Sequence, residues 1–289
     1  TWQKQQGYGA GLTVTGLEGG HSGSEIDKEH ANANILMGRV LKYLSDRMEL
    51  AVVSLAGGLK DNAIPRECET EIVIPEEKKA ELSDYITELE KIFKKEYAVS
   101  DPAVCIEIKE NGTGEYDVLS YSSMTKVIFY LRNVPNGVQH MSMVMPGLVE
   151  TSLNLGVLTL EKDKLTLQYA VRSAVGTAKE YLLKRIAALV EEFGGRVTNT
   201  GNYPAWEYRR DSVLRDDMVR IFKEMYGKEP TVEAIHAGLE CGILAGKIDG
   251  LDAVSIGPDM IAIHTTEEKL SISSTKRVWD YILKVIACK

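Results

Sequence analysis

Residues 8–45, which read YGAGLTVTGLEGGHSGSEIDKEHANANILMGRVLKYLS, determine the fold that we expect for the first part of the chain. Residues 8–16 are small, apolar or β-branched and predict a strand, and the glycine-rich residues 19–23 follow it as a loop. Residues 27–45 predict a helix with one apolar side. The side chains on that side are Ala31, Ile35, Val40 and Leu44. The stretch therefore predicts the opening strand, loop and helix of an α+β unit.

The following residues complete this unit and then repeat its plan. Two strands (residues 49–55 and 68–74) and a helix that opens at Pro75 follow the first helix. The next hundred residues predict a strand, a helix, two strands and a helix at residues 104–109, 120–131, 148–160, 165–174 and 178–193. We therefore expect a duplicated β-α-β-β-α unit, at about residues 1–100 and 101–200, with its helices on one face of the sheet.

The pattern changes after residue 200. Residues 199–204 are rich in Gly, Asn and Pro and mark a boundary. Beyond them the sequence predicts helices at residues 213–226, 238–246 and 273–287, and short strands at residues 232–236, 253–256 and 260–263. Alternating strands and helices are typical of a parallel sheet, so residues 201–289 read as an incomplete α/β segment. The overall fold class is α/β, with an α+β domain over residues 1–200.

Composition and charge exclude several classes of function. The formal net charge of −8 argues against a nucleic-acid or anionic-membrane partner. No stretch reaches the roughly 18 uninterrupted apolar residues that a membrane-spanning helix needs, and no signal peptide is visible. The four cysteines are scattered and form no C-x-x-C pair, which indicates a reducing compartment and makes the cytoplasm the expected location.

Three stretches carry residues suited to chemistry. In residues 19–23, glycines surround His21 and let the backbone approach a ligand, although an exposed histidine in a plain turn would look the same. Gly238 opens a predicted helix whose amide groups could meet a substrate, although simple helix capping also accounts for it. His264 follows an apolar strand, where metal ligands collect in α/β sheets, although a lone histidine can be purely structural.

Two further residues are candidate substrate contacts. Arg172 falls inside an apolar strand, so it needs a partner such as a carboxylate, and the polar residues 150–154 could support it. Asn62 lies in a turn, which Asx-turn chemistry alone would explain. His30 and His140 have no supporting pattern, and we expect both at the surface.

Together these motifs resemble the aminoacyl-histidine (Xaa-His) dipeptidases, which belong to a family of two-zinc peptidases that includes the carnosinases. The resemblance runs in order along nearly the whole chain. The matching strings are GLEGGHSG at residues 16–23, NAN at 32–34, DNAIPRE at 61–67, GLVETSLNLG at 147–156, HAGLECG at 236–242, IHT at 263–265 and LSISS at 270–274.

The resemblance implies a role for each candidate residue. His264 matches a ligand to one of two divalent metals, and His21 matches the lid histidine that stabilises the oxyanion. Asn62 and Arg172 match lid residues that hold the substrate, Arg172 by its C-terminal carboxylate, and Gly238 matches a backbone contact to substrate. Residues 1–200 then correspond to the lid, and residues 201–289 to the C-terminal part of the catalytic domain.

The chain also departs from the family pattern. No histidine is followed two residues later by aspartate, and the acidic pair that supplies the family's general base has no counterpart. The chain begins at Thr1 without Met, as a processed or truncated product would. We therefore expect a metal-dependent dipeptidase in the cytoplasm that acts on Xaa-His dipeptides with two divalent ions, which the resemblance implies are zinc. We expect this fragment by itself to be inactive and to bind metal at most weakly. Homodimerisation stays open. The alternatives are a carboxypeptidase or deacylase of the same family, or a non-enzymatic dimerisation or binding module.

Overall fold

A computed structural model describes residues 1–162, 164–234, 240–262 and 266–288 of the chain. The chain divides into two compact units, which are described separately. The first contains residues 1–173 and 177–200, and the second contains residues 174–176 and 201–289. The assignment of these parts as a lid and as a segment of a catalytic domain stays a prediction.

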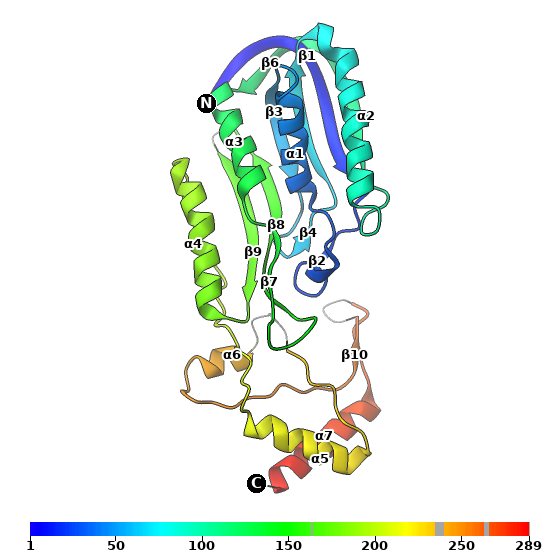
Figure 1. Cartoon of the computed structure of the whole chain (residues 1–289), viewed down its shortest axis with the longest axis vertical. Coiled ribbons are helices and arrows are strands. Elements are labelled where there is room, and N and C mark those ends of the chain that lie inside the picture. Colours follow the sequence, from blue (N-terminus) through cyan, green and yellow to red (C-terminus); the bar gives the residue numbers. More distant parts are fainter. Residues whose placement is uncertain (163, 235–239, 263–265, 289) are drawn as a thin grey trace. The chain divides into compact units, whose positions relative to one another are not determined.

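One antiparallel sheet of seven strands forms the first unit (Figure 1). Its strands are β1 (Trp2–Thr15), β3 (Ala51–Gly57), β5 (Cys68–Ile74), β6 (Cys105–Leu119), β7 (Gly137–Met141), β8 (Val149–Leu160) and β9 (Leu165–Ser173). The order across the sheet is β6-β1-β5-β3-β8-β7, and β9 also pairs with β8. A separate two-residue ladder joins β2 (Gly20–His21) to β4 (Ala63–Ile64).

The predicted elements of both halves occur in the predicted order, and the second half contains one strand more, β7, between α3 and β8. The pairing shows how the halves share one sheet. β6 runs along the whole of β1 and so extends the strands of the first half. β8 pairs with β3 through Ala56 and Gly57, which joins the two halves. The mixed α/β fold that the sequence predicts is confirmed.

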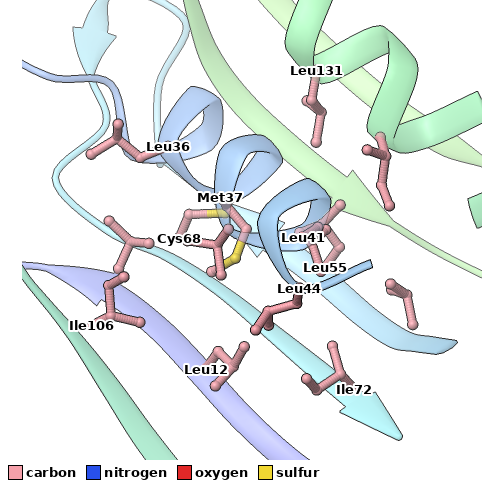
Figure 2. Close-up of a cluster of buried hydrophobic side chains, with 14 of the residues drawn as sticks. Leu12, Leu36, Met37, Leu41, Leu44, Leu55, Cys68, Ile72, Ile106 and Leu131 are labelled. Carbon is pink, nitrogen blue, oxygen red and sulfur yellow. The ribbon is translucent and has the colours of Figure 1, made fainter. Parts of the chain in front are cut away.

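The helices of the first unit enclose its main core. They are α1 (Ala33–Ser45), α2 (Lys79–Glu96), α3 (Tyr121–Asn133) and α4 (Gly176–Glu192). Figure 2 shows α1 presenting Leu36, Met37, Leu41 and Leu44 to strand residues such as Leu12 and Ile72. The first helix begins six residues later than predicted, because Asn32 caps it and accepts hydrogen bonds from the backbone of Asn34 and Ile35. Residues 26–28 form a separate 3₁₀ turn.

The second unit contains α5 (Val213–Tyr226), α6 (Glu240–Ala245), β10 (Met260–Ile261), β11 (Lys269–Leu270) and α7 (Ile272–Ala287). Helices α5 and α7 pack together through Met218, Ile221, Tyr281 and Val285. The predicted parallel strands are wrong where they can be checked: residues 253–256 and 232–234 form no strand, and β10 pairs antiparallel with β11. A strand needs a hydrogen-bonded neighbour, and the described residues of this unit offer these segments none.

None of the described helices combines the length and the apolar character that crossing a bilayer demands.

Candidate functional site

The loop that carries His21 lies beside the turn that carries Asn62. In the short ladder of β2 and β4, His21 is opposite Ala63. The backbone amide of Ser22 donates a hydrogen bond to the carbonyl of Asn62 at 2.9 Å. These backbone bonds fix two segments that lie about forty residues apart in the sequence against each other.

The hydrogen bonds of His21 determine which ring nitrogen carries the proton. Its Nδ1 accepts from the backbone amides of Gly23 and Ser24, each at 3.2 Å. A backbone amide can only donate, so Nδ1 is unprotonated, and the neutral ring carries its hydrogen on Nε2. The side chain of His21 is exposed. The loop therefore presents an N–H donor, the group that stabilises a developing oxyanion.

Gly23 allows His21 and Arg172 to approach each other. A Cβ atom at Gly23 would lie 2.9 Å from Cε1 of His21 and 3.2 Å from Cζ of Arg172. Both distances are shorter than most real Cβ contacts, so a larger residue at this position would displace the imidazole and press on the guanidinium. The imidazole and the guanidinium thus share one small site.

Arg172 lies near the end of β9, where its Nε is buried and has no hydrogen-bond partner among the residues that the structure describes. Burial lowers the pKa of this guanidinium, and the nearby carboxylate of Asp61 opposes that shift. An arginine remains protonated despite such a shift. A buried donor without a partner costs roughly 1–3 kcal/mol, so the site is suited to a ligand that accepts from it, such as a carboxylate.

Glu25 closes the loop around His21. One carboxylate oxygen accepts from the backbone amide of His21 at 2.8 Å, and the other accepts from Nζ of Lys28 at 2.7 Å. The bond from Lys28 and then the bond from His21 hold the pKa of Glu25 below its usual value. The ionised form of Glu25 therefore stabilises the loop.

A buried asparagine, Asn154, holds the turn that carries Asn62. Its Nδ2 donates to the carbonyls of Asp61 at 2.9 Å and Ala63 at 2.8 Å, on either side of Asn62. Its Oδ1 accepts from Nδ2 of Asn32 at 3.1 Å. Since Asn32 also caps α1, one buried polar network connects the start of that helix to the turn.

The structure brings three of the five candidate residues together. All three residues belong to the first unit. His21 and Asn62 lie in neighbouring loops, and Arg172 approaches His21 at Gly23. Gly238 and His264 lie outside the described residues. Among the residues that are described, no three His, Cys, Asp or Glu side chains form a group that could hold a metal ion. The roles assigned to all five residues stay predictions.

The two other histidines differ from each other. His140 is exposed, as predicted. The surface position predicted for His30 is wrong: its side chain is 15% exposed, and its Nδ1 lies 3.0 Å from the carbonyl of Ser100 and 3.7 Å from the buried carboxylate of Asp101. Its role is structural, because Asp101 also accepts from the backbone of Glu18 and Ala31.

Sequence reasoning missed Glu25 and the linking role of Asn154. Residues 150–154 were expected only as support for Arg172, whereas Asn154 acts on the turn of Asn62. An asparagine in the middle of an apolar strand is a usable signal, since a buried amide must find partners. Glu25 gave no comparable signal, because an acid in a polar loop is usually solvated.

Replacing Asn154 by Ala should loosen the turn of Asn62. The part-buried carbonyls of Asp61 and Ala63 would lose their donor, which costs about 1 kcal/mol of unfolding free energy for each hydrogen bond. We expect faster hydrogen exchange at the backbone amide of Ser22, which donates to Asn62. Asn133→Ala is the matched control, because Asn133 is exposed and bonds only to its own helix. Unchanged exchange at Ser22 in Asn154→Ala would contradict this role.

The His21 loop should open in acid. A carboxylate whose pKa is lowered by folding stabilises the folded loop above its unfolded pKa, and this contribution is lost as the pH falls through the folded pKa. We therefore expect the His21 amide, which donates to Glu25, to exchange faster once the pH drops below the ordinary pKa of glutamate, after correction for intrinsic exchange. Glu25→Gln should remove this pH dependence. A wild-type loop that keeps its protection in acid would refute the role of Glu25.

Comparison with known proteins places these features in a family. Residues 12–101 match the family described as Peptidase dimerisation domain. The cytosol non-specific dipeptidase of Escherichia coli (strain K12) is 31% identical over 275 residues, which cover 95% of this chain and 56% of that protein. The crystal structure of aminoacylhistidine dipeptidase from Vibrio alginolyticus matches with a TM-score of 0.91 and 30% identity, over 99% of this chain and 60% of that one.

The chain thus spans a little under two thirds of the length of both relatives. The likeness to Xaa-His dipeptidases that the motifs predicted is confirmed by these matches. Over nearly all of its residues the chain is similar to these two dipeptidases, and residues 12–101 match the dimerisation domain of a peptidase family.

Proposed function

We propose that the chain forms the substrate-binding lid and part of the catalytic domain of a metal-dependent dipeptidase that acts on Xaa-His dipeptides. The observation that carries this proposal is the meeting of His21 and Arg172 at Gly23, next to the turn of Asn62. A dipeptide has a free carboxylate one residue away from its only peptide bond. One cation and one N–H donor at close range fit those two groups.

Each residue has a separate task in this proposal. Arg172 binds the C-terminal carboxylate of the dipeptide, which supplies the acceptor that its buried Nε lacks. Asn62 holds the peptide through its side-chain amide. Nε2–H of His21 donates to the carbonyl oxygen of the scissile bond as negative charge develops there. Donors of this kind contribute about 3–4 kcal/mol to transition-state stabilisation.

The metal requirement rests on the family rather than on the described residues, which do not assemble a metal site. Two divalent ions, zinc in our proposal, would activate the attacking water in the intact enzyme. His264 would be one ligand, and the backbone at Gly238 would contact the substrate. We propose that the other ligands come from the part of the family's length that this chain does not span, and that the protein works in the cytoplasm.

The 289-residue chain should accordingly be inactive by itself. Three protein ligands are usual at a catalytic zinc, and only His264 is assigned here. Hydrolysis of an Xaa-His dipeptide by the purified chain with added zinc would contradict this part of the proposal.

The role of Arg172 can be tested in the full-length protein by comparing a dipeptide with its C-terminal amide. The wild-type enzyme should prefer the free carboxylate, and Arg172→Met should remove that preference. Loss of one charge-assisted contact predicts a KM for the dipeptide that is about 10- to 100-fold higher, with little change for the amide.

Arg185→Met serves as the matched control, because Arg185 is an exposed residue of α4 with the same charge. It should leave the discrimination unchanged. If Arg172→Met slowed hydrolysis of the dipeptide and of its amide equally, Arg172 would not recognise the carboxylate, and this part of the proposal would fail.

A further inference from the structure

Asp61 is a charged residue next to the candidate site, and none of the contacts described above uses its side chain. Its backbone is held in place, because its carbonyl accepts from Nδ2 of Asn154 at 2.9 Å. Gly156 lets this backbone lie directly on β8, since a Cβ atom at Gly156 would be 2.4 Å from Cα of Asp61. Asp61 is exposed, and its carboxylate forms no hydrogen bond or ion pair with the residues that the structure describes. A fixed backbone thus carries a carboxylate that is available to a ligand.

The register of the sheet places the turn of Asp61 on the same face as Arg172. Arg172 pairs with Ser152 of β8, and Asn154 follows two residues later on that strand. Side chains that pair across strands, or that lie two residues apart on one strand, point to the same face of a sheet. Leu153, between them, points to the opposite face and packs against α4. Arg172 and the Asn154 amide that holds Asp61 therefore share the face that α4 does not cover.

The charges of Asp61 and Arg172 interact, although the two groups do not pair. Burial lowers the pKa of the Arg172 guanidinium, and the nearby negative charge of Asp61 acts in the opposite direction. Within the described part of the chain, no ion pair joins the two side chains, and Nε of Arg172 has no acceptor. A guanidinium and a carboxylate that lie close together without pairing are suited to a ligand that carries both an acceptor and a donor.

The order of groups along a dipeptide determines which of them Asp61 can contact. In the proposed function, Arg172 holds the C-terminal carboxylate and His21 donates to the scissile carbonyl. The side chain of the C-terminal residue branches from the same carbon atom as that carboxylate. The N-terminal ammonium lies on the other side of the scissile carbonyl. A negative charge beside Arg172 therefore meets the C-terminal side chain.

We propose that Asp61 selects dipeptides by the side chain of their C-terminal residue, because its carboxylate accepts a hydrogen bond from an imidazole N–H and repels acidic side chains. Histidine provides such an N–H in both its neutral and its protonated form. A carboxylate in this position also disfavours competitors, since an aspartate or glutamate side chain would bring two negative charges together. The inference rests on the proposed function, which sets the position of the dipeptide at Arg172.

Hydrolysis of Ala-His, Ala-Leu and Ala-Glu by the full-length protein tests the proposal. The wild-type enzyme should prefer Ala-His and hydrolyse Ala-Glu most slowly. Asp61→Asn keeps the size of the side chain and removes its charge, so kcat/KM for Ala-His should fall about tenfold while that for Ala-Leu stays within about twofold. Asp61→Lys should reverse the order of Ala-His and Ala-Glu. Asp84→Asn is the matched control, because Asp84 is an exposed acid of α2, and it should leave all three values unchanged.

The outcomes separate this inference from the proposed function. If the enzyme prefers a dipeptide to its C-terminal amide but Asp61→Asn leaves the ranking of the three dipeptides unchanged, only this inference fails. It also fails if Asp61→Asn, shown to be folded by circular dichroism, slows Ala-His and Ala-Leu equally, because Asp61 would then act on the turn and not on the side chain. An enzyme that hydrolyses none of the three dipeptides overturns both proposals.

Discussion

Two hydrogen bonds from the buried side chain of Asn154 connect the interior of the sheet to the candidate site. They bind the carbonyls on both sides of Asn62, and the backbone of Asn62 in turn holds the amide of Ser22, next to His21. Asn32 orients the amide of Asn154 and starts α1 at the same time. A buried amide with every partner satisfied rigidifies its surroundings. The position of both site loops thus depends on the same contacts that place the first helix.

Arg172 differs from Asn154, whose side-chain amide has hydrogen-bond partners. Its Nε is buried without a partner, and burial lowers the pKa of its guanidinium. Such an arrangement opposes folding, and sites that bind ligands commonly retain it because the ligand provides the missing acceptor. Gly23 contributes by leaving out a side chain where His21 and Arg172 approach each other. A satisfied network and a buried Nε–H without an acceptor among the described residues therefore lie within one site: the first fixes the geometry, and the second can donate to an anion.

The sequence predicted helix ends correctly where capping residues are present at those ends. Helix α5 occupies the predicted residues, because Ser212 caps its start and Gly227 ends it in a left-handed conformation. The strand predicted over residues 104–109 instead extends to Leu119, since pairing along β1 overrides the turn-like residues 111–114. The parallel strands predicted after residue 200 lack neighbours among the described residues. Hydrophobic periodicity does not show which distant segments of the chain pair with each other.

The candidate site also combines residues that the sequence predicted with contacts that it did not. Motifs identified His21, Asn62 and Arg172, and the structure places them around neighbouring loops. Their support by Asn154 and Glu25 depends on contacts across 93 and 4 positions of the chain, respectively. Neither contact follows from residue type alone. The apolar setting of Arg172 was the exception, since a charge in an apolar strand already required a partner.

In our proposal, His21 and Arg172 form one site for a peptide carboxylate and its neighbouring carbonyl. Nuclear magnetic resonance of the chain, titrated with an Xaa-His dipeptide, tests it most directly. We predict that the Nε–H signal of Arg172 and the ring nitrogens of His21 shift together with a single dissociation constant, and that the dipeptide amide leaves the Arg172 signal unchanged. Shifts at only one of the two residues, or equal shifts with the amide, would contradict it.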